Sequence, residues 1–227
     1  MIRLFSFFIV SLFLCATSFA QNQASIAIPP QPTVTFSLDF PESVPSHYSI
    51  RVTKDGKASY ESMGKLTPEA EGDPFSYSFT MTNANLERIF ELAKTAKYFQ
   101  TEVEYKKGRQ ANTGKKTLSY TGPDHHGEVS YNYSSREEIQ QFTRIFQSIA
   151  STIEGVRRLQ YFHQYQPLAL EADLKRMEEM AKAKDLEELQ AAAPILQEIM
   201  DDKSVLNVSR VRAQRLLAIG NPGTSSR

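Results

Sequence analysis

The chain has 227 residues and no net charge at neutral pH, because 26 lysines and arginines balance 26 acidic residues. This balance argues against a general binder of nucleic acid or of anionic membranes. The single cysteine, Cys15, lies in an expected targeting signal, so the exported chain would have no disulfide, no thiol nucleophile and no cysteine metal site. Its core must hold it together, and aromatic side chains supply that core, with 14 Phe and 10 Tyr in the whole chain.

Residues 1–20 have the pattern of a secretory signal peptide. Arg3 gives a positive start, Leu4 to Ala16 is apolar, and Ser18-Phe19-Ala20 fits a small-x-small cleavage pattern. We therefore expect a periplasmic or secreted protein with no stable membrane anchor after cleavage. Lipid attachment at Cys15 is the alternative.

The next part of the chain, residues 21–32, is polar and rich in proline, which predicts a flexible leader. Alternation of apolar and polar residues then predicts strands, with Asp55-Gly56 as a hairpin turn. The expected strands are 33–40, 47–53, 58–63, 75–81, 102–105, 117–120 and 128–133. A helix that contains Leu86 and Phe90, capped by Thr82 or Asn83, should follow the fourth strand.

A long amphipathic helix is predicted over residues 135–164. Apolar residues recur at steps of three and four along it: Ile139, Phe142, Phe146, Ile149, Ile153, Val156 and Leu159. Ser135 and Glu138 fit a capping box at its start, and Pro167 should end the run. We expect its first half to pack on the sheet and its second half, beyond Gly155, to receive the C-terminal helices.

After Pro167 the pattern becomes helical. The expected helices are 170–183, a segment capped by Asp185 that Pro194 breaks or kinks, 195–200 and 208–219. The predicted fold class is α+β: an antiparallel sheet with two helices on one face, followed by a C-terminal helical module. The expected division is a sheet domain at 33–165, a helical module at 166–220 and a disordered tail at 221–227.

Two parts of the chain resemble known families. Residues 194–220 resemble one HEAT repeat, with Asp201-Asp202 at the turn, Val211-Arg212 and Leu216-Leu217 in the second helix, and a terminal Gly220. The resemblance implies a helical hairpin of the kind that binds partners. A lone repeat cannot bury a continuous core, so it should dock on neighbouring helices.

Residues 46–60 are similar to a family of exported bacterial domains of unknown function. The likeness consists of the strand Tyr48-x-Ile50-x-Val52, the Asp-Gly hairpin and Tyr60 on the return strand. The family's usual cysteine-bearing motif is missing, and residues 43–45 stand in its place. This resemblance implies a fold and no activity.

Few residues form a pattern typical of a catalytic or metal site. No nucleophile elbow, P-loop, zinc-protease or dinucleotide motif is present, so we expect no catalytic residues, no cofactor and no metal. Asp124 with His125-His126 is the one clustered set of potential metal ligands. Adjacent residues on an extended turn point in different directions, so an exposed polar hairpin turn is the favoured interpretation.

Two surfaces remain as candidates for binding. The basic residues Lys106, Lys107, Arg109, Lys115 and Lys116 could bind phosphate, lipid headgroups or an acidic polymer, or could protect a sheet edge from aggregation. The tyrosines of the strands could form an aromatic surface for carbohydrate or could lie half in the core: Tyr48, Tyr60, Tyr77, Tyr120, Tyr131 and Tyr133.

These features together predict an exported, non-enzymatic protein that binds a protein partner or has a structural role. A hydrolase of unrecognised type, acting in a cleft between sheet and helix, is one alternative. An inhibitor or accessory protein that binds through its sheet face is the other.

Overall fold

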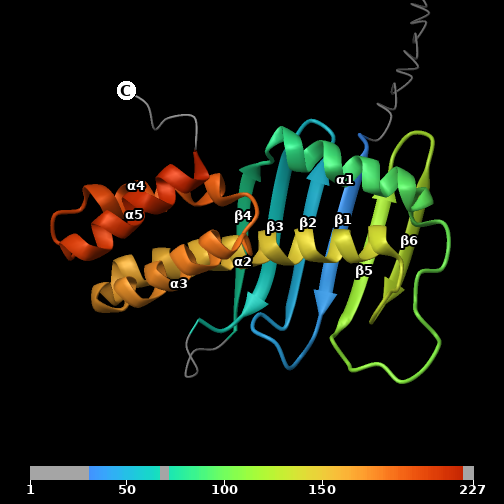
Figure 1. Ribbon diagram of the computed structural model, residues 1–227, viewed down its shortest axis with the longest axis horizontal. Coiled ribbons are helices and arrows are strands. Elements are labelled where there is room, and N and C mark those ends of the chain that lie inside the picture. Colours follow the sequence, from blue (N-terminus) through green and yellow to red (C-terminus); the bar gives the residue numbers. More distant parts are fainter. Residues whose placement is uncertain (1–30, 67–71, 222–227) are drawn as a thin grey trace, which may run out of the picture.

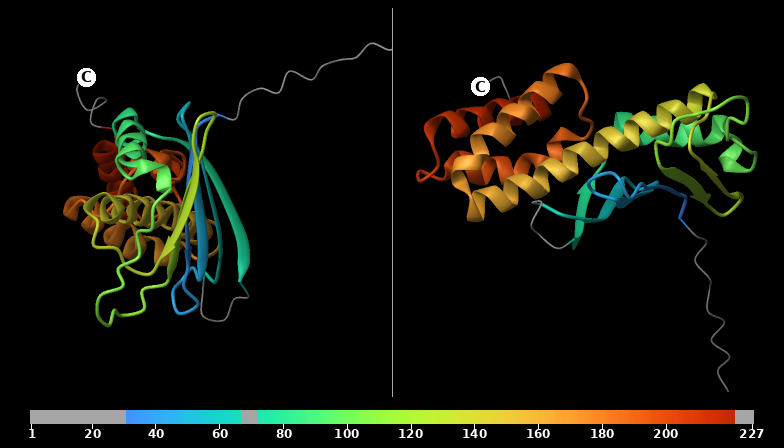
Figure 2. Two further views of the ribbon diagram at one scale, coloured as in Figure 1. Left: turned by 90° about the vertical axis from the view of Figure 1, so that its right-hand side faces the viewer. Right: turned by 90° about the horizontal axis from the view of Figure 1, so that it is seen from below.

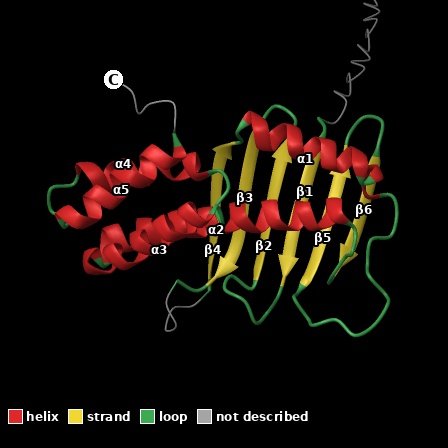
Figure 3. Ribbon diagram, viewed as in Figure 1, coloured by secondary structure: helices red, strands yellow, loops and turns green. Residues whose placement is uncertain are grey.

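The computed structural model describes residues 31–66 and 72–221. The expected signal peptide, most of the expected leader and the tail beyond Asn221 lie outside this part of the chain. The expected α+β class is confirmed: one six-stranded antiparallel sheet lies behind a layer of helices (Figures 1 and 3). The strand order is β4-β3-β2-β1-β5-β6. The strands are β1 (Thr33–Asp39), β2 (His47–Thr53), β3 (Lys57–Gly64), β4 (Asp73–Thr80), β5 (Lys115–Thr121) and β6 (His126–Tyr131).

One face of the sheet is apolar and the other is polar, as two-residue alternation requires. The register places Phe36 opposite both Ile50 and Leu118, and all three are fully buried. The opposite face carries mainly serine and threonine, such as Ser37, which pairs with both Ser49 and Thr117. No helix of the described chain covers this polar face (Figure 2).

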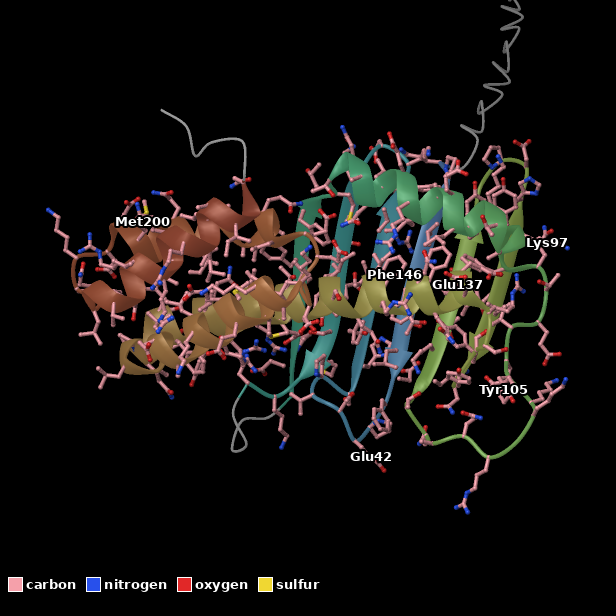
Figure 4. All side chains as sticks on the ribbon, viewed as in Figure 1. Glu42, Lys97, Tyr105, Glu137, Phe146 and Met200 are labelled. Carbon is pink, nitrogen blue, oxygen red and sulfur yellow. The ribbon has the colours of Figure 1, made fainter. Side chains whose placement is uncertain are left out.

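Two helices cover the apolar face, α1 (Asn83–Thr95) and α2 (Glu137–Tyr165). Thr82 caps α1, because its side chain accepts a hydrogen bond from the backbone N–H of Asn85. Phe146 of α2 lies over the central strands (Figure 4) and stacks on Phe36, with 5.2 Å between ring centroids. The helix has 29 residues and is about 43 Å long, so it continues well past β4 (Figure 2).

Beyond the sheet, the second half of α2 packs with the C-terminal helices. These are α3 (Leu170–Ala183), α4 (Ala193–Asp201) and α5 (Asn207–Gly220), with short 3-10 turns η2 (Pro167–Ala169) and η3 (Leu189–Ala192). Val156 and Leu159 belong to this second core cluster, whereas Ile153 belongs to the first. A Cβ on Gly155 would lie 3.3 Å from Cε of Met177, so this glycine allows α3 to approach closely.

Hydrogen bonds tie the C-terminal helices to the sheet layer. The Glu188 carboxylate accepts from the backbone N–H and the hydroxyl of Thr82, both at 2.8 Å, and from the Asn85 amide at 2.7 Å. Tyr77 of β4 donates to the Ala191 carbonyl at 2.7 Å. An acid at the start of α1 also complements the helix dipole. The two core clusters are therefore joined by polar contacts as well as by α2.

Four local predictions are wrong. Asp185 caps no helix, because the chain is left-handed at Lys184 and Glu188 and only the 3-10 turn η3 follows. Residues 102–105 form a loop beside β6, since the Glu104 carboxylate rather than a strand ladder binds the N–H of Asn132, at 2.7 Å. The residue before α2 is Arg136, and Ser135 makes no cap bond. Pro194 lies in the first turn of α4, where its missing N–H costs nothing, so it starts a helix instead of breaking one.

The connection from α1 to β5 opens with an unusual left-handed turn, η1 (Lys97–Phe99). Its three residues have φ between 52° and 60°. The turn packs against Gly127 of β6, where a Cβ would lie 2.2 Å from the Tyr98 carbonyl oxygen. A close approach of two backbones thus fixes a conformation that L-residues rarely adopt.

Candidate functional site

The long helix α2 carries a second, polar stripe beside its apolar one. Its members follow one another at steps of four, three, four, three and four: Gln140, Arg144, Gln147, Ser151, Glu154 and Arg158. The stripe lines two adjoining cavities that both include Gln147. We call this surface the α2 groove. From Gln140 to Arg158 it extends for 18 residues, or about 27 Å along the helix.

The first cavity lies between α2 and the ends of β5 and β6 and has a volume of about 460 Å³. Its lining residues are polar or aromatic and include no Asp or Glu: Thr113, Lys116, Tyr131, Asn132, Tyr133, Ser134, Gln140, Thr143, Arg144 and Gln147. At its rim, Tyr133 packs its ring against Tyr105, 5.8 Å away, in the loop seen beside β5 and β6 in Figure 4.

Lys116 is a buried cation in the wall of this cavity, with only 3% of its surface exposed. Its ammonium donates to the Thr113 hydroxyl and the Asn132 carbonyl, both at 2.9 Å, and contacts the Thr113 and Gly114 carbonyls at 3.1 and 3.2 Å. No carboxylate of the described residues forms an ion pair with it. Burial lowers the pKa of Lys116, and the charge of Glu104 opposes this shift.

Arg144 and Gln147 contribute the free polar groups of the first cavity. Both side chains are exposed, and neither forms a hydrogen bond or an ion pair within the described chain. The other two arginines of α2 are engaged: Arg157 donates to the carbonyls of Gly64 and Asp73, and Arg158 pairs with Asp173. Arg144 is therefore available to a ligand.

The second cavity, of about 390 Å³, lies between α2, the turn after β1 and α3. Its carboxylate, Glu154, accepts hydrogen bonds from Tyr60 and Ser62, both at 2.7 Å. Burial and then the charge of Glu154 raise the pKa of Tyr60 above its ordinary value. Asp173 holds both Arg158 and Arg176. These groups already bind one another, which favours a structural role over acid–base catalysis.

The structure separates the basic residues that the sequence places in one loop. Lys116 is buried in β5, whereas Lys115 is exposed and points to the opposite face of the strand. Lys106 pairs with Glu102. The alternation of β5 could have indicated that Lys116 is buried. Lys116 lies on the same face of the strand as Leu118 and Tyr120, which face the core.

The tyrosines of the strands do not form an open aromatic surface. Tyr48, Tyr60, Tyr120 and Tyr131 are buried on the helix-covered face of the sheet. Tyr77 lies half-buried on the same face, and Tyr133 is exposed beyond β6.

The two neighbouring histidines at the β5–β6 turn have different surroundings. His125 stacks on Tyr98, with ring centroids 3.9 Å apart, and His126 begins β6. Within residues 31–66 and 72–221, no three His, Cys, Asp or Glu side chains gather closely enough to hold a metal ion.

The two edges of the sheet differ. Beside β6, the connecting loop is bound near both ends of the strand: Gln100 donates to the His126 carbonyl at 3.3 Å and Glu104 accepts from the Asn132 N–H at 2.7 Å. Between these bonds, residues 99–103 of the loop lie opposite residues 128–130 across a small cavity, so the loop occupies the space beside that edge. Beside β4, Ser76 and Ser78 are exposed. The Met81 N–H donates to the Gly56 carbonyl at 2.8 Å, so these two residues form a hydrogen-bonded pair at the start of the β3–β4 ladder. Hydrogen-bonded and non-hydrogen-bonded pairs alternate from there, and Ser76 and Ser78 fall in non-hydrogen-bonded pairs. The N–H and C=O groups of both serines therefore point away from β3.

An aromatic ladder follows the same open edge. Phe75, Tyr77 and Phe79 of β4 are half-buried and stack in series, with centroids 6.3 and 6.4 Å apart. Beyond this ladder, α2 and the helices packed on it continue past the sheet on the apolar side (Figure 2). We call this feature the β4 edge: free backbone groups at Ser76 and Ser78, bordered by aromatic side chains.

Comparison with known proteins adds no family to this description: no protein-family model and no curated protein matches the chain. Among the described residues, none of the helices has the length and apolar character needed to cross a membrane.

Proposed function

We propose that this chain is an exported, non-enzymatic binding protein whose β4 edge takes an extended segment of a protein partner as a seventh strand. The observation that carries the proposal is the row of outward backbone groups at Ser76 and Ser78. Unpaired groups of this kind form hydrogen bonds with an added strand, which supplies affinity without any catalytic residue.

The composition of β4 also favours strand addition. Sheet edges are commonly blocked by lysine, by bulges or by proline within the strand. β4 has no lysine or arginine, its pairing with β3 continues without a bulge, and its proline, Pro74, is the second residue of the strand. The aromatic ladder offers apolar contacts to alternate side chains of an added strand. We therefore expect a partner segment with alternating apolar and polar residues.

The helices beyond β4 favour a single strand over a second copy of the chain. Two copies paired edge to edge in one sheet would be related by a twofold axis, so both helical layers would lie on the same face. The α2 of the second copy would then need the space that α2 and α3 of the first copy occupy beyond β4 (Figures 1 and 2). An isolated extended segment has no such layer.

The groups of the α2 groove favour binding over the hydrolase alternative. A hydrolase that uses no metal commonly has a nucleophile beside a free base, or two carboxylates around the reacting bond. Glu154 is the one carboxylate that lines the two cavities, and Tyr60 and Ser62 already bind it.

Proline substitution at the edge tests the proposal. Ser78→Pro removes an outward N–H and leaves the ladder to β3 intact, because proline is tolerated at such edge positions. Ser78→Ala is the matched control, since it removes the hydroxyl and keeps the N–H. Each purified protein would be used for quantitative affinity capture from a periplasmic extract, with circular dichroism to confirm the fold.

We expect partners that the wild-type protein and Ser78→Ala capture equally and that Ser78→Pro fails to capture. Equal capture by a folded Ser78→Pro protein would contradict the proposal, as would capture of no partner by the wild-type protein. If the wild-type protein is a dimer in solution and Ser78→Pro is a monomer, the β4 edge binds a second copy of the chain and not a segment of another protein.

A further inference from the structure

We infer that the first cavity of the α2 groove is a binding site for a small polar molecule that carries one carboxylate. The site is distinct from the β4 edge and does not depend on the proposed function. Its volume of about 460 Å³ lies within the range of small-molecule sites, about 300–1,000 Å³.

The charge of the cavity selects an anion. The buried ammonium of Lys116 has neutral oxygen partners only, and no acidic residue lines the cavity. Arg144 adds a second positive charge that forms no ion pair with the described residues. Two cations around a partly enclosed space attract a negative group more strongly than they would in water, because screening is weaker there.

The free hydrogen-bonding groups define the ligand further. Arg144 and Gln147 are three residues apart on α2, so their side chains lie next to each other on one face. A guanidinium offers two parallel N–H donors that match the two oxygens of a carboxylate. The amide of Gln147 can donate and accept, which suits a hydroxyl or amide beside that carboxylate.

A carboxylate fits better than a phosphate dianion. The Lys116 ammonium already contacts four oxygens, so it contributes through its charge and has no proton to spare for a ligand. One guanidinium remains for direct contact, and the charge of Glu104, which acts on Lys116, offsets part of the second positive charge, so a single negative charge is favoured. The exposed ring of Tyr133 at the rim, 38% accessible, can cover an apolar face of the same molecule.

Titration of the full exported chain with small probes tests this site. The probes are glucuronate, glucose, which lacks the carboxylate, and glucose 6-phosphate, which carries a phosphate instead. Binding is followed by NMR shifts of backbone amides around residues 131–147. Variants are Arg144→Gln, which removes the direct donor, and Lys115→Gln, which removes the same charge from the exposed face of β5.

We expect saturable shifts with glucuronate at millimolar concentrations, none with glucose and weaker ones with glucose 6-phosphate. Arg144→Gln should weaken glucuronate binding at least about tenfold, as expected for loss of a charged hydrogen-bond pair. Lys115→Gln should leave it unchanged, and both variants should keep the wild-type unfolding temperature because neither side chain has a partner in the described chain.

Three results would overturn the inference: no saturable shifts with glucuronate, equal shifts with glucose, or equal weakening by Arg144→Gln and Lys115→Gln. Stronger binding of glucose 6-phosphate than of glucuronate would refute the choice of a carboxylate. None of these outcomes bears on capture at the β4 edge.

Discussion

The two core clusters should unfold together, and cavity-forming substitutions on α2 can test this. Phe146 is fully buried in the sheet cluster, where its ring stacks on Phe36 and Phe142. Leu159 is fully buried in the cluster of C-terminal helices. Substitution of a buried Phe by Ala costs about 3–5 kcal/mol, and that of a buried Leu about 2–5 kcal/mol.

Both costs should appear in the same transition, because α2 and the contacts of Glu188 and Tyr77 connect the clusters. At about 2–4 °C per kcal/mol for a protein of this size, Phe146→Ala should lower Tm by about 6–20 °C and Leu159→Ala by about 4–20 °C. Leu206→Ala, at an exposed site, is the control and should change stability by less than about 0.5 kcal/mol.

Differential scanning calorimetry would measure these shifts, and far-UV and near-UV circular dichroism would follow helix content and tyrosine packing separately. A single transition at one midpoint for both probes is expected in every variant. Two resolved transitions, with Leu159→Ala lowering only the one that reports helix loss, would show that the clusters unfold independently and would refute the reasoning.

Three further predictions concern local features, each measured by urea denaturation. Lys97 has a left-handed backbone, so Lys97→Gly should raise the free energy of unfolding by up to about 1 kcal/mol. Lys94→Gly, in α1, should lower it by about 1 kcal/mol. If both substitutions changed the free energy of unfolding in the same direction, the reasoning would be contradicted. Gly127→Ala should destabilise by about 1–3 kcal/mol, because the added Cβ meets the Tyr98 carbonyl, and a neutral effect would refute that contact. Hydrogen bonds from Lys182 and Arg212 lower the pKa of Glu178 below its usual 4.5, so its stabilising contribution is present above that pH and is lost as pH falls through the lowered pKa. The destabilisation by Glu178→Gln should therefore be larger at neutral pH than in acid, and a pH-independent difference would contradict the pairing.

The layers of the fold could be predicted because two periodicities dominate this sequence. Strict alternation places Phe36 and Leu38 on one face of β1, and steps of three and four place Phe142 and Phe146 on one face of α2. Local chemistry was less predictable, since several solutions satisfy the same backbone groups. Ser135 could have capped α2, and Pro194 could have ended a helix or begun one.

The sequence indicates the polar stripe of the α2 groove but not the cavities that the stripe lines. The 4-3-4-3-4 steps from Gln140 to Arg158 predict a polar stripe, but a stripe becomes a cavity wall only when distant segments stand opposite it. Thr113 and Asn132 on one side, and Pro45 on another, complete the two cavities. Such contacts between residues far apart in the chain depend on tertiary structure and have no local signal.

The continuity of α2 has a thermodynamic consequence for any molecule bound in its groove. The polar stripe passes residue 155, where the apolar stripe changes from one core cluster to the other. A ligand that binds only the folded groove adds RT ln(1 + [L]/Kd) to the stability of the native state. Since the groove needs α2 intact, this gain should slow hydrogen exchange in α5 as well as in β5, although these two elements lie toward opposite ends of α2 (Figure 1).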